Sequence, residues 1–415
     1  MVPHLVTDDD GTGAITTLRF CGAADGSSSS RDFGRAQKTP DDSEIVGGRT
    51  ETTLPFKLIN NHIYVEGRIN GRGPYSFMVD SGGHTIISPI LAKQLGLFAE
   101  GSVTASGMGE ASSSSGYATV KEIAIGGLRF RNQIAITVPP VEEGAEGFPA
   151  DGVVGFELLR RYVVRIDYNA NTITFIKPGK LKRTNLGAAV PFEFYDEMPQ
   201  VQGSVAGVPA RMVIDTGARH EASLTSPFVN TSDIGARYPN APTTIVGWGL
   251  GGKSIGKVVR VPDVTIGSVK VVNPVISLRA SKSGAMSDAN VDANIGSGLL
   301  KRFIVTFDYP RQIMYLKKIA APSADVGAYD RSGMWINAVP QGYTVTFVNA
   351  NGPAAQAGVM VGDVIANVDG QTARPELLSS TREKLRGHPS DGVVRLSIKR
   401  GDQVREVNIT LKDAV

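Results

Sequence analysis

The chain has 415 residues, with 43 basic and 40 acidic side chains and a formal net charge of +3. This length is too great for one ordinary core and suits two or three domains. The near balance of charge does not indicate nucleic acid as a partner, and no run of about 18 apolar residues predicts an integral membrane segment. A single cysteine, Cys21, excludes an intramolecular disulfide and a multi-cysteine metal site.

We expect residues 1–50 to form a disordered leader. The segment is rich in Ser, Gly and Asp and poor in large apolar residues, so burial cannot offset the entropy lost on folding. It also lacks the basic n-region and the apolar h-region of a secretory signal. The residues as they stand therefore predict no export signal.

An internal repeat organises residues 55–320. The two copies begin near Pro55 and Pro191, and each has a glycine turn followed by an apolar, strand-like run, YSFMVDSGG and ARMVIDTGA. Each run ends in an Asp-(Ser/Thr)-Gly triplet, which places Asp80 and Asp215 at equivalent points of two similar lobes. The agreement indicates duplication of one unit.

Each copy continues with a Gly-rich stretch, 107–116 or 247–252, that we expect to form an exposed hairpin. Both copies close with similar units, DGVVGFELLRRYVVRIDYNANTITFIK and NIGSGLLKRFIVTFDYPRQIMYLKK. Short apolar strands between Gly, Pro and Asn turns, with brief helices at SPILAKQLGL and ELLRRY, predict a mainly β fold. We place the two lobes at 51–180 and 187–320, and a small α+β domain at 327–415.

Asp80 and Asp215 are the candidate catalytic residues. If a pseudo-two-fold axis brings the two lobes together, two neighbouring carboxylates cannot both ionise cheaply, so one keeps a proton. The charged carboxylate can then take a proton from water, while the protonated one hydrogen-bonds a scissile carbonyl. This chemistry hydrolyses an amide without a metal or another cofactor.

Four neighbours of the aspartates have supporting roles in this scheme. Gly82 and Gly217 would let the backbone approach closely and offer N–H donors to the carboxylates. Ser81 and Thr216 would supply hydroxyls that cross-link the two loops under the pair. We therefore expect all four residues to fix the separation of the carboxyl groups.

The runs FMVDSGG…VVGFELL and MVIDTGA…NIGSGLL resemble those of pepsin-like and retropepsin-like aspartic proteases. The resemblance is specifically to the bacterial aspartyl protease family with two retropepsin-like lobes and a PDZ domain. It implies two closed β lobes, a cleft for a peptide or protein substrate, a monomeric aspartic endopeptidase, and a periplasmic or envelope location. By position, the flaps over the cleft would carry Gly107, Met108, Gly109, Gly247, Trp248 and Gly249.

One departure from the family pattern concerns the residue after each triplet, which is Gly83 or Ala218. Pepsin-like enzymes often have Ser or Thr there, whose hydroxyl helps to stabilise a carboxylate. The absence of that hydroxyl predicts a less acid-shifted pair of aspartates than in a gastric enzyme.

The same residues allow other interpretations. A catalytically inactive, peptide-binding scaffold of the same fold is the alternative function. His84 and His220 follow the aspartates, but their unequal spacing matches no metal motif, so we expect exposed loop histidines and no metal site. Asp167 and Asp308 recur symmetrically too, and we expect them to be structural turn or strand-edge residues.

The C-terminal segment GPAAQAGVMVGDVIANVDG resembles the PDZ domains of bacterial proteases. The resemblance implies that a loop with free N–H groups and the strand after it bind a peptide ligand. Gly333, Met334, Trp335 and Ile336 occupy that position. Trp335 stands where such loops often have glycine.

Overall fold

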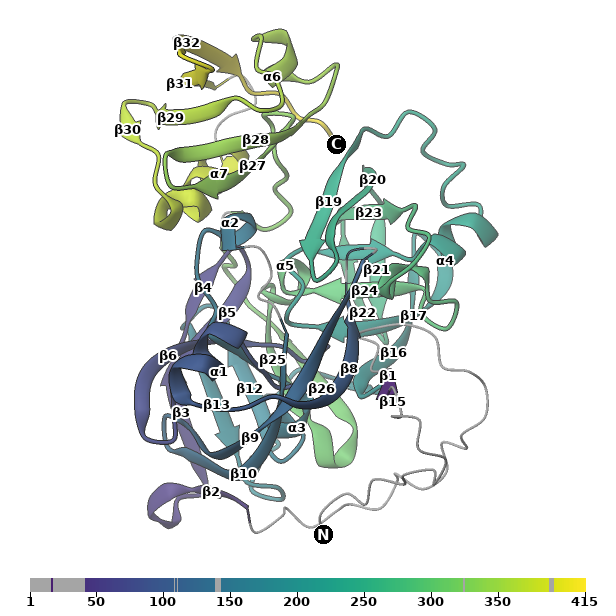
Figure 1. The fold of residues 1–415 in the computed structure, drawn as a ribbon. Helices are drawn as coiled ribbons and strands as arrows, with labels where there is room; N and C mark the ends of the chain where they lie inside the picture. The colour runs from purple at the N-terminus through teal and green to yellow at the C-terminus, as the bar shows by residue number, and fades with distance from the viewer. Residues whose placement is uncertain are drawn as a thin grey trace, which may run out of the picture.

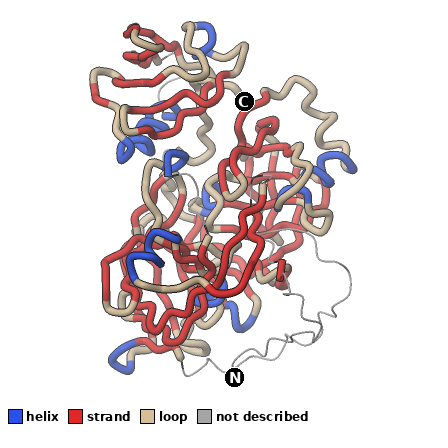
Figure 2. The backbone as a smooth tube through the Cα atoms, viewed as in Figure 1, coloured by secondary structure: helices blue, strands red, loops and turns tan. Residues whose placement is uncertain are grey.

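The computed structural model describes residues 16–17, 42–107, 109, 111–138, 143–323, 325–387 and 392–415. Two β lobes lie against each other, and a smaller β domain lies at one end of the molecule (Figure 1). Strands predominate and the helices are short (Figure 2). The predicted fold class is confirmed. None of the helices within these residues is long and apolar enough to cross a bilayer.

The first lobe is a mixed sheet that closes on itself. Strand β9 (Ser112–Ile125) pairs with β10 (Leu128–Thr137) and, near its end, with β5 (His62–Ile69), which closes the barrel. The side chains of Ile63 and Val65 are buried in its core. The other elements of the lobe are β4 (Lys57–Ile59), β6 (Arg72–Val79), β7 (Ile86–Ile87), β8 (Glu100–Ser106), β11 (Gly152–Val154), α1 (Pro89–Leu95), α2 (Glu143–Glu146) and α3 (Phe156–Leu159).

Helix α1 shows how the sequence sets local structure in this lobe. The Ser88 hydroxyl accepts a hydrogen bond from the Leu91 N–H at 3.1 Å, and Pro89 occupies the first turn, where a missing N–H costs nothing. Gly96 ends the helix in the left-handed region, at φ 68°. These are the start and stop signals of the predicted SPILAKQLGL helix.

The second lobe repeats the first, with two interruptions. Its elements are β15 (Glu193–Tyr195), β16 (Met198–Val205), β17 (Val208–Asp215), β18 (Ala222–Leu224), α4 (Ser226–Thr231), β19 (Thr243–Gly249), β20 (Gly252–Arg260), β21 (Asp263–Ile266), β22 (Val269–Val272), β23 (Val275–Arg279), η2 (Ala285–Ser287), β24 (Ala293–Gly296) and α5 (Ser297–Leu300). Pro262 separates β20 from β21 and Pro274 separates β22 from β23, because proline cannot donate to a ladder. Strand β21 still pairs with β16, as β9 pairs with β5 in the first lobe.

A six-stranded sheet joins the two lobes. Its strands are, in order, β14 (Ala188–Pro191), β26 (Ile313–Lys318), β25 (Phe303–Asp308), β12 (Val163–Asp167), β13 (Thr172–Ile176) and β3 (Glu51–Pro55). The central pair is antiparallel, with Arg165 opposite Thr306, so the closing units of the two copies meet there. Strand β25 leads into η3 (Tyr309–Arg311).

Asp167 and Asp308 lie at the ends of these central strands, away from the triplets. The Asp167 carboxylate accepts turn N–H groups of Asn169 and Ala170, both at 3.0 Å. The Asp308 carboxylate is buried and pairs with Arg311 at 3.1 Å. Both carboxylates therefore serve the local structure of turns and strand ends.

The C-terminal domain has a hydrophobic core of its own. Its sheet runs β27 (Met334–Val339), β28 (Gly342–Val348), β29 (Val364–Val368), β31 (Val393–Arg400) and β32 (Gln403–Thr410), with β30 (Gln371–Thr372) beside β29. Its helices are α6 (Pro353–Gln356), η4 (Pro375–Leu377) and α7 (Leu378–Gly387). Tyr343, Ile365 and Leu378 are fully buried in this core. The two lobes, in contrast, share one larger hydrophobic core.

The predicted leader extends too far toward the first lobe. Ser43–Ile45 forms strand β2, which pairs with β10, and η1 (Val46–Gly48) follows it. The prediction of disorder rested on the composition of the whole segment and overlooked Ile45, which is 2% exposed in the core of the lobe. Apart from strand β1 (Thr16–Thr17), beside β8, the rest of the leader lies outside the described residues.

Candidate active site

The two aspartates lie at the ends of equivalent strands. Asp80 directly follows β6, and Asp215 is the last residue of β17. Each strand lies between two neighbouring strands of its sheet, so each carboxyl group is at the end of a buried apolar strand. A charge is costly in such surroundings. Asp215 is only 8% exposed.

The loops that carry the aspartates are cross-linked by four symmetric hydrogen bonds. The Ser81 N–H donates to the Thr216 hydroxyl at 2.9 Å, and the Thr216 N–H donates to the Ser81 hydroxyl at 3.0 Å. The Ser81 hydroxyl donates to the carbonyl of Ile214, and the Thr216 hydroxyl donates to that of Val79. Both hydroxyls are buried, so this network holds the two strand ends at a fixed separation.

Glycines let each loop approach the opposite aspartate. A Cβ added to Gly82 would lie 2.8 Å from the Asp215 carboxyl carbon, and one added to Gly217 would lie 2.4 Å from that of Asp80. A Cβ at Gly83 would lie 2.7 Å from an Asp80 oxygen, so this position has no room for the side chain that is common in pepsin-like enzymes. The structure thus brings Asp80, Asp215 and the glycines into one compact cluster.

The two carboxyl groups differ in their electrostatics. Burial and the negative charge of Asp215 raise the pKa of Asp80 well above its ordinary value. Burial also raises the pKa of Asp215, but hydrogen bonds from Asn294 and from the Asp80 carboxyl oppose this rise. Burial thus acts on both carboxyl groups, and the hydrogen bond from Asn294 favours the charged form of Asp215 in particular.

Two hairpins meet over the aspartates, at the places predicted for flaps. The Gly109 N–H of the β8–β9 hairpin donates to the carbonyl of Leu250 at 2.9 Å, and the Ala111 N–H donates to that of Gly251 at 3.3 Å. A Cβ at Gly109 would lie 2.1 Å from the Gly251 carbonyl carbon, so the tips meet only because glycine is there.

The hairpins and both lobes enclose a cleft that reaches the aspartates. The predicted flap residues that line it are Gly107, Gly247, Trp248 and Gly249. Met108 lies outside the described residues. Most of the other lining side chains near the aspartates are apolar, among them Tyr64, Met78, Val138, Phe148 and Val246.

The start of the C-terminal domain's first strand faces the lobes. The side chains of Met334 and Ile336 are 6% and 2% exposed, in the core of that domain. Gly333 has φ 72°, a conformation that other residues adopt at a cost. Gly333 to Ile336 and helix α7 border a cavity between this domain and the second lobe. Backbone groups of this segment already have partners: the Gly333 N–H donates to Asp330 at 2.9 Å, the Met334 N–H donates to the Ser332 hydroxyl at 3.3 Å, and the Ile336 carbonyl accepts from Arg382 at 2.8 Å.

Trp335 connects this domain to the second flap. Its ring stacks on Trp248 with 6.5 Å between centroids and an interplanar angle of 25°. The guanidinium of Arg219 lies 4.3 Å from the Trp335 centroid, and that of Arg382 lies 5.4 Å from it. The tryptophan that replaces the usual glycine is therefore a contact between the C-terminal domain and the cleft wall.

Comparison with known proteins decides the family. Residues 65–158 and 201–296 match the aspartyl protease family model, one match in each lobe. The chain belongs to the aspartyl protease family. Residues 324–411 match the PDZ domain model, so this aspartyl protease family member has a C-terminal PDZ domain.

Matches to individual proteins are distant. No curated protein matches the chain. A solved aminopeptidase N family protein from Idiomarina loihiensis is 23% identical over 22% of this chain and 15% of that chain, with a TM-score of 0.19. The HtrA3 PDZ domain bound to a phage-derived ligand is 20% identical over 20% of this chain and 84% of that chain, with a TM-score of 0.18.

Two polar residues beside the aspartates of this family member have roles that the sequence did not predict: Asn294 was not singled out, and His220 is not the exposed loop histidine that was expected. The Asn294 side-chain amide donates to Asp215 at 2.7 Å, and His220 lies 3.0 Å from the Asn294 side-chain oxygen. The repeat contains a signal for Asn294, because the equivalent residue of the first copy is Val153. No spacing rule points to His220, whose partner is distant in the sequence.

A buried glutamate on α2 lies where both lobes meet the PDZ domain. Glu146 lies 3.6 Å from His62, 3.3 Å from Arg219 and 3.8 Å from Arg382 of α7. The Asn60 side chain also donates to it at 2.9 Å. Burial would raise the pKa of Glu146, but the charges of Arg219, His62 and Arg382 outweigh burial and lower it. Glu146 is thus an anion at the junction of both lobes and the PDZ domain.

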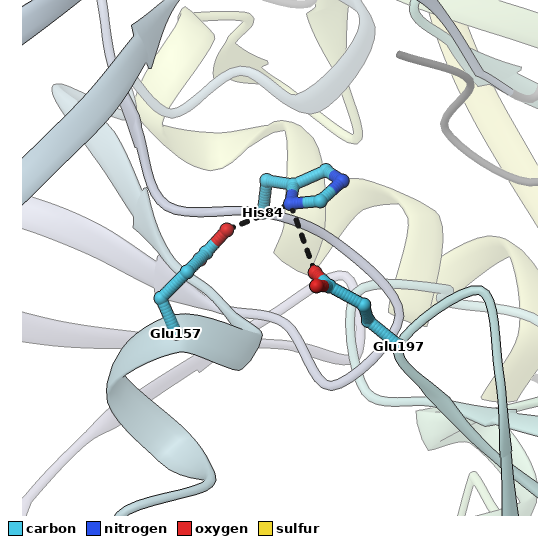
Figure 3. A group of neighbouring side chains, drawn as sticks. All are labelled: His84, Glu157 and Glu197. Carbon is cyan, nitrogen blue, oxygen red and sulfur yellow. Dashed lines mark hydrogen bonds and ion pairs between the residues drawn. The ribbon is translucent and has the colours of Figure 1, made fainter. Parts of the chain in front are cut away.

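His84 is not the exposed loop histidine expected from the sequence. Its side chain is 14% exposed, and its Nδ1 lies 2.7 Å from Glu157 and 3.3 Å from Glu197 (Figure 3). Burial opposes the charged imidazole, but the hydrogen bond and charge of Glu157, with the charge of Glu197, outweigh burial and raise the pKa of His84. The expectation was wrong because it judged His84 by its local sequence, whereas Glu197 comes from the other lobe.

The same three side chains are grouped closely enough to hold a metal ion. Each offers one ligand atom, and the three atoms of His84, Glu157 and Glu197 lie within 4.8 Å of one another. The 2.7 Å contact between His84 Nδ1 and Glu157 also suits an imidazolium that donates a hydrogen bond to a carboxylate. We describe the cluster as an ion pair that joins the lobes.

Proposed function

We propose that this aspartyl protease family member is an aspartic endopeptidase, in which Asp80 and Asp215 activate a water molecule. The observation that carries the proposal is the close pair of unequal carboxyl groups, cross-linked through Ser81 and Thr216, at the floor of a cleft covered by two hairpins. A purely structural role does not explain why two buried carboxyl groups that repel one another are held together.

The unequal pair suits a general acid–base mechanism. The Asp215 carboxylate takes a proton from water as the water oxygen adds to the scissile carbonyl carbon, and Asp80 gives its proton to the carbonyl oxygen. The neutral tetrahedral intermediate then returns a hydroxyl proton to Asp80. Asp215 gives its proton to the amide nitrogen as the C–N bond breaks. Both carboxyl groups end as they began.

The cleft suggests the class of substrate. An extended peptide under the two hairpins would meet mainly apolar side chains, such as Met78, Phe148 and Val246. We therefore expect cleavage between apolar residues of extended or unfolded chains, because an unpaired charge would lose hydration in this cleft. Sequencing of the fragments from an unfolded protein tests this preference.

Loss of either aspartate tests the function itself. We expect purified wild-type protein to cleave an unfolded protein, and Asp80→Asn and Asp215→Asn each to lower kcat/KM by at least about a thousandfold, since each proton transfer needs its partner. Asp167→Asn is the matched control, because an amide oxygen can still accept the turn hydrogen bonds of Asp167. Cleavage that survives both active-site substitutions would contradict the mechanism, and a wild-type protein without activity would favour the scaffold.

The PDZ domain has a proposed role in access to the cleft. Its Trp335 stacks on Trp248 of the second flap, and the cavity beside Gly333 is where a PDZ domain would receive a peptide ligand. A ligand in this cavity would disturb the contact between Trp335 and the flap. The PDZ domain would thus bind a peptide and regulate entry of the substrate.

A further inference from the structure

The two lobes differ at one position beside the aspartates. Val153 on β11 lies opposite Met78, two residues before Asp80, and Asn294 on β24 lies opposite Val213, two residues before Asp215. Strand β11 is parallel to β6 as β24 is parallel to β17, so Val153 and Asn294 are structural equivalents. One lobe therefore has an apolar side chain where the other has an amide.

The amide of Asn294 is directed at one aspartate only. Its Nδ2 donates to Asp215 Oδ2 at 2.7 Å, and the residue is fully buried. Backbone N–H groups reach both carboxyl groups, from Gly82 and Gly217 to Asp80 and from Gly217 to Asp215. The side-chain amide is the donor that distinguishes the two carboxyl groups.

His220 fixes the orientation of this amide. Its Nε2 lies 3.0 Å from the side-chain oxygen of Asn294 and 3.3 Å from the carbonyl oxygen of Asn294. Both are acceptors, so Nε2 bears the hydrogen. Burial and the charge of Arg279 lower the pKa of His220 to about 3, which keeps the ring neutral. With its oxygen held by His220, the amide presents its nitrogen to Asp215.

The second oxygen of Asp215, Oδ1, differs from the oxygen that Asn294 contacts. Within the part of the chain that the structure describes, Asp215 Oδ1 is buried and accepts no hydrogen bond from a fixed N–H or hydroxyl. A Cβ added to Gly82 would lie 3.0 Å from this oxygen, so Oδ1 faces the loop that follows Asp80. One oxygen of Asp215 thus accepts the hydrogen bond of Asn294, and the other lies beside the loop of the first aspartate.

We propose that Asn294, oriented by His220, decides which aspartate carries the charge: it holds Asp215 as the carboxylate and leaves Asp80 as the acid. Asn294 and His220 are positioning residues, since they act through Asp215. The inference rests on the proposed peptidase function. Without Asn294, the second N–H donor, from Gly82, would favour the charge on Asp80, and only His62 would favour it on Asp215, so the proton would reside on Asp80 with less preference.

The substitution Asn294→Val, which copies the first lobe, tests this proposal through the pH profile of kcat/KM. The acid limb reports the first ionisation of the pair, which forms the Asp215 carboxylate that Asn294 favours. The alkaline limb reports the second ionisation, that of Asp80, and the Asp215 carboxylate is present both before and after it. We expect the acid limb to move up by about one pH unit and the alkaline limb to stay in place. Asn290→Val, at an exposed asparagine of the same lobe, is the control and should move neither limb.

The possible outcomes separate this inference from the proposed function. If the wild type cleaves and Asn294→Val loses activity equally at every pH with both limbs unmoved, Asn294 is merely structural and the inference is overturned. If the wild type cleaves at no pH, the proposed function fails and the inference fails with it. Should Asn294→Val not fold, as judged by its thermal transition, His220→Phe replaces it. That variant frees the amide to rotate, so the acid limb should move in the same direction by less, and an unmoved limb would overturn the proposal.

Discussion

His84 makes an ion pair across the two lobes, with Glu157 on its own lobe and Glu197 on the other. Its pKa is raised in the folded protein, so its charge contributes stability below the unfolded value of 6.5. This stability is lost as the pH rises through the folded pKa. The pair should therefore hold the lobes together in weakly acidic solution.

We expect His84→Gln to lower the free energy of unfolding by about 1 kcal/mol near pH 6 and by less at pH 9, because glutamine keeps only a neutral hydrogen bond. Denaturant unfolding at the two pH values measures the difference. Lys57→Gln is the control, since its pair with Glu66 is exposed and within one lobe. A destabilisation that grows with pH would contradict the ion pair.

The residues of the site divide into those that the sequence predicts and those that it does not. Asp80 and Asp215 occur in repeated triplets at strand ends, and repetition is visible in a single sequence. Asn294 breaks the repeat, and His84 and Glu146 gain their partners only when distant segments meet. Side chains that act through long-range contacts leave no local pattern, so one sequence could not have assigned them.

At the scale of elements, the sequence predicted the strands, the two hairpins and the short helices from apolar runs and turn residues. It did not predict that Pro262 and Pro274 divide two long strands of the second lobe. It also did not predict α2, whose four residues EGAE carry no helical periodicity. This short helix places Glu146 beside His62, although its sequence gives little sign of a helix.

The contact between the hairpin tips has a consequence for substrate entry. The tips are joined by the Gly109–Leu250 and Ala111–Gly251 hydrogen bonds, so the hairpins in this structure close the cleft from above. We expect an extended peptide to enter more readily when these two bonds are broken, because the tips meet backbone to backbone. The contacts of the flaps should therefore influence the rate of cleavage.

At the scale of the whole molecule, the PDZ domain contacts the second flap through Trp335. The sequence predicted the PDZ domain but not where it docks. The position of the domain depends on surface contacts between separately folded parts, and these contacts leave no pattern in the sequence. Trp335 lies against Trp248, Arg219 and Arg382, and Arg382 also reaches Glu146 between the lobes. The docked PDZ domain should hold the second flap in its closed position.

We expect Trp335→Ala to raise kcat/KM for a long unfolded substrate several-fold, because the lost stacking and cation–π contacts are worth on the order of 1–2 kcal/mol and favour the closed flap. Trp335→Phe keeps an aromatic ring and should give a smaller increase. Initial rates with both variants measure the effect. An unchanged or lower rate for Trp335→Ala would show that the docked domain does not restrain the flap.

The central claim is that Asp80 and Asp215 share one proton. A titration of the aspartate carboxyl carbons by ¹³C NMR tests it most directly, with Asp80→Asn and Asp215→Asn used to assign the two signals. The account predicts two separate steps for the pair, with the Asp80 signal keeping its proton well above the ordinary aspartate value of 3.8. Two signals that titrate independently near that ordinary value would contradict it.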